Sequence, residues 1–77
     1  MTAKTYTLYS SEGCHLCEQA FELCQQLGVA EQVNVIDIVE HDEYFDTYKF
    51  HIPVLENNAT AEKLFWPFDL EGLKELL

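Results

Sequence analysis

Two cysteines three positions apart, Cys14 and Cys17, are the residues of this chain whose types and spacing most directly suggest chemistry. They follow a short apolar stretch and stand where a helix is expected to begin. A pair at this spacing can form a redox couple, supply half of a zinc site, or fill a core as small apolar side chains. The rest of the sequence has to separate these three interpretations.

The position of the pair favours redox chemistry. At the start of a helix, unpaired N–H groups and the positive end of the helix dipole stabilise an anion. The thiolate is the nucleophilic form of cysteine, so this placement would activate Cys14. Cys17 would lie about one turn further along the same face, close enough to attack a mixed disulfide formed at Cys14. We therefore take Cys14 as the candidate nucleophile and Cys17 as the candidate resolving thiol.

A metal site and a purely structural role stay open as alternatives. Zinc usually takes four ligands, and the pair supplies only two of them. Cys24 lies two helical turns beyond Cys17, too far to share one ion unless the helix breaks, and we interpret it as a core residue. The histidines are scattered through the chain: His15, His41 and His51. We therefore expect no metal ligands among the site residues.

Seven elements are expected to position the pair, in the order strand, helix, strand, helix, strand, strand, helix. β-Branched and aromatic residues predict the strands, and apolar residues three or four positions apart predict the helices. The strands are expected at 5–9, 33–38, 53–56 and 62–66, and the helices at 14–28, 41–50 and 69–77. The strand at 33–38 is apolar on both faces and is expected to be covered on both sides. A right-handed crossover and a final hairpin then give a mixed four-stranded sheet flanked by helices.

Several helix ends are also predicted. Gly28 is expected to end the first helix in a left-handed conformation, and Asp42 and Asp69 are expected to cap the second and third helices. Phe68 is expected to pack on Leu73 as a hydrophobic staple. The apolar residues of the last helix should face the core: Leu70, Leu73, Leu76 and Leu77.

Composition and charge narrow the function classes. The 77 residues are expected to form one domain, 1–77, and 14 acidic residues against four Lys and no Arg give a formal charge of −10. Such a protein repels nucleic acid and anionic membranes, so we expect neither as a partner. No export signal or membrane-spanning run is visible. We therefore expect a cytoplasmic protein, in which a close cysteine pair is more often catalytic or metal-binding than structural.

Four segments, taken in order, carry a resemblance that covers essentially the whole chain: LYSSEGCHLCEQA, VIDI, HIPVLE and LFWPFDLEGL. Together they resemble the short bacterial glutaredoxin-like proteins of the thioredoxin superfamily. A Cys-x-x-Cys pair beside a strand–helix–strand pattern is typical of thioredoxin-like redox motifs. The resemblance implies a minimal thioredoxin-like α/β fold of order β-α-β-α-β-β-α and thiol–disulfide oxidoreductase activity. It also implies that Pro53 is the cis-proline facing the redox pair, with the backbone of Ile52 held beside Cys14.

The chain departs from ordinary glutaredoxins, which usually carry Cys-Pro-Tyr-Cys after a basic residue. Here the middle residues are His15 and Leu16, and Glu12 stands where a positive charge would help. The Gly-Gly turn that lets glutathione approach the backbone is replaced by the block 66–68, although Asp69 could still match the acidic residue that meets the amine of glutathione. With no Arg and few Lys to bind carboxylates, glutathione is a possible but poorly matched reductant. We expect no bound cofactor.

We therefore expect a thiol–disulfide oxidoreductase whose substrate groove lies beside the pair. The expected groove residues are Gly13, His15, Ile52, Pro53, Trp66 and Asp69. We expect a monomer that acts on a protein or small-molecule disulfide and is recycled by a reductase or by glutathione. Two other functions stay open: a redox-inactive binding module of the same fold, and a metal or iron–sulfur protein. The block around Trp66 could be a recognition surface beside Cys14 or a plug that closes a very small core.

Alkylation of the reduced protein with iodoacetamide tests the expected activation of Cys14. A helix N-terminus contributes roughly 0.3–1 kcal/mol when exposed and up to ~2 kcal/mol when partly buried, which corresponds to about one pKa unit. We expect the pKa of Cys14 to lie below the free-thiol value of ~8.5, at about 7. An alkylation midpoint above that of a free thiol would contradict the activation.

Overall fold

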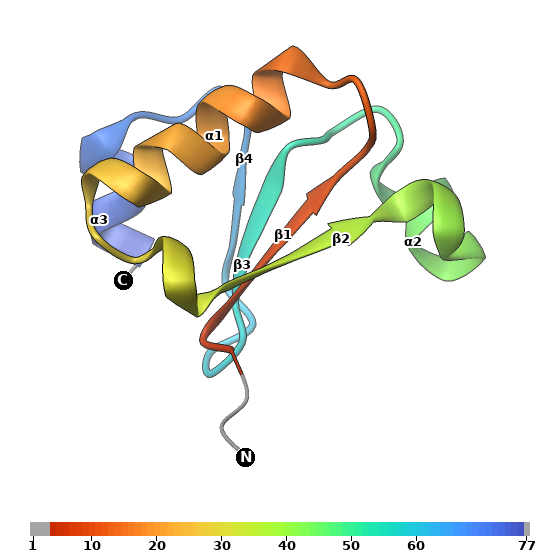
Figure 1. Ribbon diagram of the computed structural model, residues 1–77. Helices are drawn as coiled ribbons and strands as arrows, with labels where there is room; N and C mark the ends of the chain where they lie inside the picture. Colours follow the sequence, from red (N-terminus) through yellow and green to blue (C-terminus); the bar gives the residue numbers. More distant parts are fainter. Residues whose placement is uncertain (1–3, 77) are drawn as a thin grey trace.

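A computed structural model gives the structure of residues 4–76, which form helices packed around a four-stranded sheet (Figure 1). The strands are β1 (Tyr6–Ser10), β2 (Val33–Asp37), β3 (Val54–Asn57) and β4 (Lys63–Phe65). The α-helices are α1 (His15–Gln26), α2 (Asp42–Tyr48) and α3 (Leu70–Leu76), and the 3-10 turns η1 (Ala30–Gln32) and η2 (Ile38–Glu40) flank β2. This order of strands and α-helices confirms the predicted β-α-β-α-β-β-α arrangement.

The sheet is mixed, with β1 in its interior. The strand order is β2-β1-β3-β4, and β1 pairs parallel to β2 but antiparallel to β3. A parallel pair needs a long crossover, which α1 supplies here. Strands β3 and β4 form an antiparallel hairpin. The predicted crossover unit and hairpin are both confirmed.

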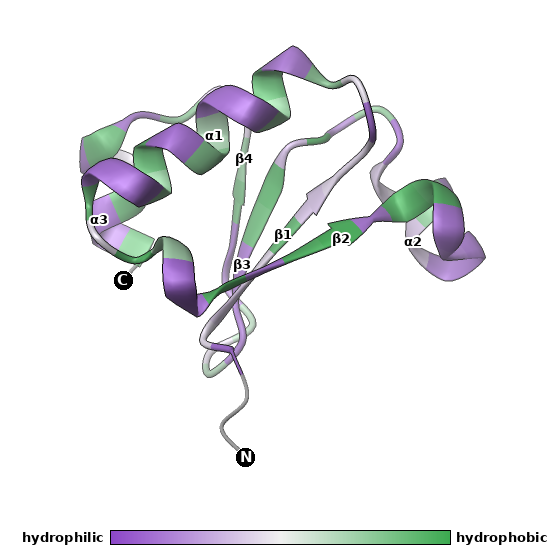
Figure 2. Cartoon of the chain, in the orientation of Figure 1, coloured by the Kyte–Doolittle hydropathy of each residue, from purple (hydrophilic) through white to green (hydrophobic). Residues whose placement is uncertain are grey.

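The helices cover the two faces of the sheet unequally. Helices α1 and α3 pack on one face over the main core, whose most buried members include Leu8, Ala20, Cys24, Leu55 and Leu73. A smaller cluster lies on the other side, towards α2, and consists of Tyr9, Ile38, Tyr48 and Val54. Figure 2 shows hydrophilic and hydrophobic segments alternating along α1, as expected for a helix with one face on a core. The predicted apolar stripe of the first helix is therefore confirmed.

The predicted ends of the first and last helices are also confirmed. Gly28 follows α1 with a φ of +75°, in the left-handed region. At the start of α3, the Gly72 N–H donates to the Asp69 Oδ1 at 2.9 Å, which makes Asp69 the cap. Phe68 packs against the core cluster that contains Leu73, in agreement with a hydrophobic staple. Of the leucines expected to face the core, Leu73 and Leu76 are buried, Leu70 is half-buried, and Leu77 lies outside the described residues.

The expectation that the second strand is covered on both sides is wrong. Strand β2 lies at the edge of the sheet, and Val35 at its centre is 50% exposed. The strand also ends one residue earlier than predicted, because Ile38 turns into η2 and is buried there. An apolar run identifies a strand, but only the sheet order decides whether a helix covers it.

The predicted cap of the second helix is also wrong. Asp42 is the first residue of α2, and His41 occupies the cap position without a side-chain hydrogen bond. The carboxylate of Asp42 still lies in the first turn, where it interacts favourably with the helix dipole.

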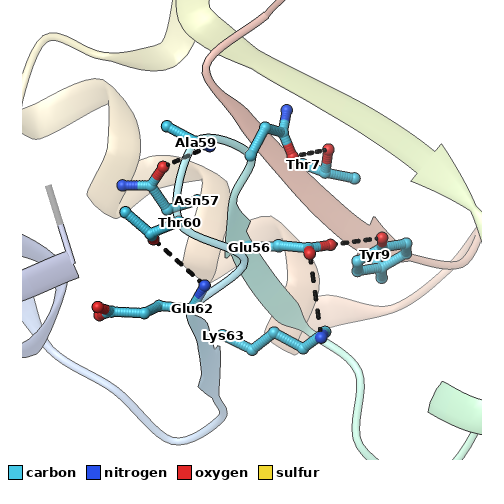
Figure 3. Close-up of polar contacts among 9 residues, drawn as sticks. Thr7, Tyr9, Glu56, Asn57, Ala59, Thr60, Glu62 and Lys63 are labelled. Carbon is cyan, nitrogen blue, oxygen red and sulfur yellow. Dashed lines mark hydrogen bonds and ion pairs between the residues drawn. The ribbon is translucent and has the colours of Figure 1, made fainter.

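Polar side chains hold the β3–β4 hairpin to the rest of the sheet (Figure 3). The Tyr9 hydroxyl donates to the Glu56 Oε1 at 2.8 Å, and the other oxygen of Glu56 lies 3.9 Å from the Lys63 Nζ. Burial and this hydrogen bond raise the pKa of Tyr9. Asn57 closes the turn by accepting from the Ala59 N–H at 2.9 Å. The sheet therefore uses Glu56 as a structural carboxylate.

None of the helices within 4–76 has the length and apolar character needed to cross a membrane.

Replacement of Asp69 by Ala tests the cap of α3. The change removes an acceptor from the first turn, and N-cap losses typically cost about 1 kcal/mol, within a range of roughly 0.5–2 kcal/mol. We expect the free energy of unfolding in urea to fall by that amount. Glu75→Ala in the last turn of the same helix is the control and should change stability by less than about 0.5 kcal/mol. Equal effects of the two substitutions would contradict the cap.

Candidate active site

A tight turn carries the chain from β1 to Cys14. The Cys14 N–H donates to the Ser11 carbonyl at 3.2 Å, and Gly13 between them has a φ of +79°. Glycine adopts this left-handed conformation without the steric cost of a side chain. The turn delivers Cys14 to the N-cap of α1, so both cysteines lie at the start of the helix as predicted.

The two cysteines form a disulfide. The Cα atoms of Cys14 and Cys17 are 5.2 Å apart, and the Cys17 N–H donates to the Cys14 Sγ at 3.1 Å. Cys14 is partly exposed, whereas Cys17 is only 5% exposed. Of the two cysteines, Cys14 is therefore the more open to an incoming thiol or disulfide.

Cys24 takes no part in this pair. It is fully buried in the main core, and burial raises the pKa of its thiol. A buried thiol in apolar surroundings is poorly nucleophilic, because its thiolate is disfavoured. The interpretation of Cys24 as a core residue is confirmed. Over residues 4–76, no three His, Cys, Asp or Glu side chains come together in a way that could hold a metal ion.

Three strand ends meet the start of α1 at one end of the sheet. The antiparallel register places the end of β1 beside Val54, the first residue of β3, which directly follows Pro53. The Trp66 N–H donates to the Pro53 carbonyl at 3.3 Å and brings the end of β4 to the same place. The Ile52–Pro53 peptide bond is cis. The topology therefore gathers the segments that carry Cys14, Pro53 and Trp66.

The other predicted groove residues are more dispersed. His15 is exposed on the first turn of α1, with its Nδ1 3.4 Å from the Glu18 Oε2. Gly13 lines a pocket together with the two cysteines. Asp69 instead lines a separate hollow at the start of α3, next to Phe68. The predicted groove residues therefore do not all line the pocket beside the disulfide.

A comparison with models of protein families identifies the family of this chain. The model of the glutaredoxin-like domain matches residues 5–77. The chain belongs to the glutaredoxin-like domain family. A comparison with curated proteins gives no match.

Solved structures agree with this assignment. The X-ray structure of the structural genomics target protein XcR50 from X. campestris is 33% identical, covers 91% of this chain and 91% of its own, and has a TM-score of 0.81. The solution structure of the same target is 32% identical over 92% of this chain and 88% of its own, with a TM-score of 0.79. The solution NMR structure of protein Ne2328 from Nitrosomonas europaea is 24% identical, covers 100% of this chain and 94% of its own, and has a TM-score of 0.80. At this identity it shows a likeness of fold alone. The glutaredoxin-like domain thus has the predicted thioredoxin-like fold.

The glutaredoxin-like domain has a hollow beside its disulfide that the sequence did not indicate. It has a volume of about 590 Å³ and lies between α1 and β2, so we call it the α1–β2 groove. Its lining includes Cys14, Cys17, Glu18, Phe21, Glu22 and Val35. The spacing of Glu18 and Glu22 places them on one helix face, but only the edge position of β2 leaves that face beside an open hollow.

The block around Trp66 packs inward in this glutaredoxin-like domain. Trp66 and Phe68 are both partly buried against the main core, and their rings meet edge to face with centroids 5.0 Å apart. The Trp66–Pro67 peptide bond is also cis, which the sequence did not indicate. This packing favours the plug over the recognition surface.

Replacement of Trp66 by Ala separates the two roles. Because Trp66 is partly buried, we expect a loss of roughly 2–3 kcal/mol in the free energy of unfolding, below the ~3–5 kcal/mol of fully buried aromatic residues. Chemical denaturation measures the loss. The control is Phe50→Ala, since Phe50 is 86% exposed and its removal should change stability by less than about 0.5 kcal/mol. Unchanged stability with lost disulfide exchange would instead assign Trp66 to recognition.

Proposed function

We propose that this glutaredoxin-like domain is a thiol–disulfide oxidoreductase that uses Cys14 as nucleophile and Cys17 as resolving thiol. The observation that carries the proposal is the disulfide at the N-terminus of α1, with Cys14 partly exposed and Cys17 buried. A pair of this kind can accept or donate two electrons without any other group of the protein.

The reaction begins from the reduced pair. The Cys14 thiolate attacks one sulfur of a substrate disulfide, the S–S bond of the substrate breaks, and one substrate thiolate leaves and takes a proton from water. The Cys17 thiol then loses its proton to water and attacks the Cys14 sulfur, which forms the Cys14–Cys17 disulfide and breaks the mixed disulfide. The second substrate sulfur leaves as a thiolate and takes up a proton from water to become a thiol. The substrate disulfide is reduced by two electrons, and the protein dithiol is oxidised by two.

The surroundings of the pair fit these two steps. The start of α1 stabilises negative charge on Cys14 in the first step. The Cys17 N–H, which is directed at the Cys14 Sγ, adds a hydrogen bond to that sulfur. Burial keeps Cys17 away from solvent thiols but within bonding reach of Cys14. In this proposal Pro53, which follows a cis peptide bond, shapes the groove for the substrate on the β3 side of the pair.

Partners and location complete the proposal. The substrate is a protein or small-molecule disulfide, and a reductase or glutathione returns the pair to the dithiol form. The protein acts as a monomer in the cytoplasm, where a reducing environment supplies such donors. The family match supports the redox class of the function and leaves the donor to experiment.

A redox titration of the purified protein tests the proposal. The protein is equilibrated across a dithiothreitol or glutathione gradient, and free thiols are labelled and counted by mass. We expect a reversible Cys14–Cys17 disulfide with a midpoint roughly between −270 and −180 mV, the range of thioredoxins, glutaredoxins and disulfide isomerases. Cys24 should stay a thiol throughout. If the two thiols never pair, the redox function is wrong and a binding module of the same fold takes its place.

Single-cysteine variants assign the two roles. Cys17→Ser should accumulate a stable mixed disulfide at Cys14, since the resolving step is lost, and mass spectrometry would detect it. Cys14→Ser should form no such adduct, because Cys17 is buried. An adduct on Cys17 in the second variant would reverse the assignment.

A further inference from the structure

The α1–β2 groove begins at the reactive disulfide and runs along α1. Cys14 and Cys17 lie at one end, and Phe21 and Val35 contribute apolar surface further along. Val35 is 50% exposed because β2 is an edge strand, so this surface is open to a partner. The groove therefore has an apolar surface that adjoins Cys14, the nucleophile of the proposed function.

Carboxylates of α1 line one side of this apolar surface. Glu18 and Glu22 follow Cys14 at steps of four residues, which places them roughly 6 and 12 Å along the helix from Cys14. Glu12 adds a third carboxylate beside the pair. All three are exposed, and no Lys is among the residues that line the groove. His15 lies close to one of them, with its Nδ1 3.4 Å from the Glu18 Oε2, and it carries charge only when protonated.

The lysines of the chain are placed elsewhere. Lys49 and Lys63 form ion pairs with Asp46 and Glu56, and Lys4 donates to the backbone carbonyl of Glu31. Lys74 lies in the last turn of α3. The negative field of the groove is therefore reinforced by the formal charge of −10 rather than cancelled locally.

We infer that the α1–β2 groove binds an extended, cationic segment of a protein substrate next to its reacting cysteine. The inference rests on the proposed function and names its substrate class. An extended chain advances about 3.3 Å per residue, so side chains about two and four residues from the cysteine reach Glu18 and Glu22. Residues two apart also share one side of a strand. The preferred substrate thus carries Lys or Arg at the second and fourth positions from the cysteine. The aliphatic parts of these side chains lie on Phe21 and Val35.

The same geometry selects against anionic substrates. Glutathione carries a net negative charge at neutral pH, and the carboxylates beside Cys14 repel it, whereas a cationic segment is attracted. Clefts lined by one sign of charge change association rates by about 10- to 1,000-fold, and salt reduces the effect. Discrimination by charge is therefore the measurable consequence.

Reduction of matched peptides tests the inference. Each peptide carries one cysteine as a mixed disulfide with the same neutral small thiol, with Lys in one peptide and Glu in the other at the second and fourth positions on both sides. Reduced protein is mixed with each peptide, and the second-order rate of reduction is measured. We expect the Lys peptide to react at least about 10-fold faster at about 0.01 M salt, and the ratio to shrink at about 1 M salt, where the Debye length falls from ~30 to ~3 Å.

Charge-neutral variants locate the effect. The double variant Glu18→Gln, Glu22→Gln should lower the ratio of the two rates severalfold. The matched control is Glu71→Gln, Glu75→Gln on α3, which removes the same charge away from the groove and should keep the wild-type ratio. Because each ratio compares two peptides on one protein, a changed reactivity of Cys14 cancels from it.

The remaining outcomes each overturn the inference. A ratio near one for the wild-type protein would mean that the groove does not select by charge. An equal loss of the ratio in both double variants would trace the preference to net charge alone, and a ratio unaffected by the groove variant would place the substrate elsewhere. A neutral small disulfide is reduced in parallel. If it reacts while the peptides are not distinguished, only this inference fails; if neither it nor the peptides react, the proposed function fails as well.

Discussion

Strand β1 pairs with a strand on each side, and this pairing fixes the positions of the other elements. All five residues of β1 are buried, and Leu8 at its centre is 1% exposed. The parallel pairing with β2 requires a crossover, so α1 has to lie across the sheet. The antiparallel pairing with β3 fixes which end of the hairpin lies beside the end of β1. The Cys14–Cys17 disulfide is thereby placed just after the end of the fully buried strand β1.

The partly exposed Cys14 is thereby held close to the end of the buried strand β1. Cys14 follows β1 after a short turn, in which Gly13 adopts the left-handed conformation. Cys17 and Cys24 continue down the buried face of α1, so burial increases along the helix away from Cys14. One helix face therefore serves both as part of the core and as the base of the disulfide. In a chain of 77 residues, where a single core is only just sufficient, such double use is expected.

The acidic character of the chain has a spatial pattern. The ion pairs of Lys49 and Lys63 lie on the side of α2 and of the hairpin, and Glu56 is tied to Tyr9 and Lys63 within the sheet. The carboxylates along α1 have no such partners among the lysines. Under the proposed function, a thiolate at the start of α1 would be surrounded by charges of its own sign, which would favour substrates that carry positive charge.

The element order, the start of α1 at the cysteine pair, the left-handed end at Gly28 and the cap at Asp69 could all be predicted from the sequence. Each depends on residues within about one turn or one strand of each other, and such local patterns can be read along the chain. The separation of Cys24 from the pair followed from helical spacing in the same way. The family resemblance, which spans the whole chain, agreed with the family model.

Which surfaces are covered became clear from the folded structure alone. The apolar run of β2 predicted a strand but not its edge position, and the exposure of Val35 follows from that position. The open hollow beside Glu18 and Glu22 depends on the same edge, and the inward packing of Trp66 depends on where β4 meets the main core. The physical reason is that burial arises from contacts between residues far apart in the chain, whereas periodicity records only which residues share a face.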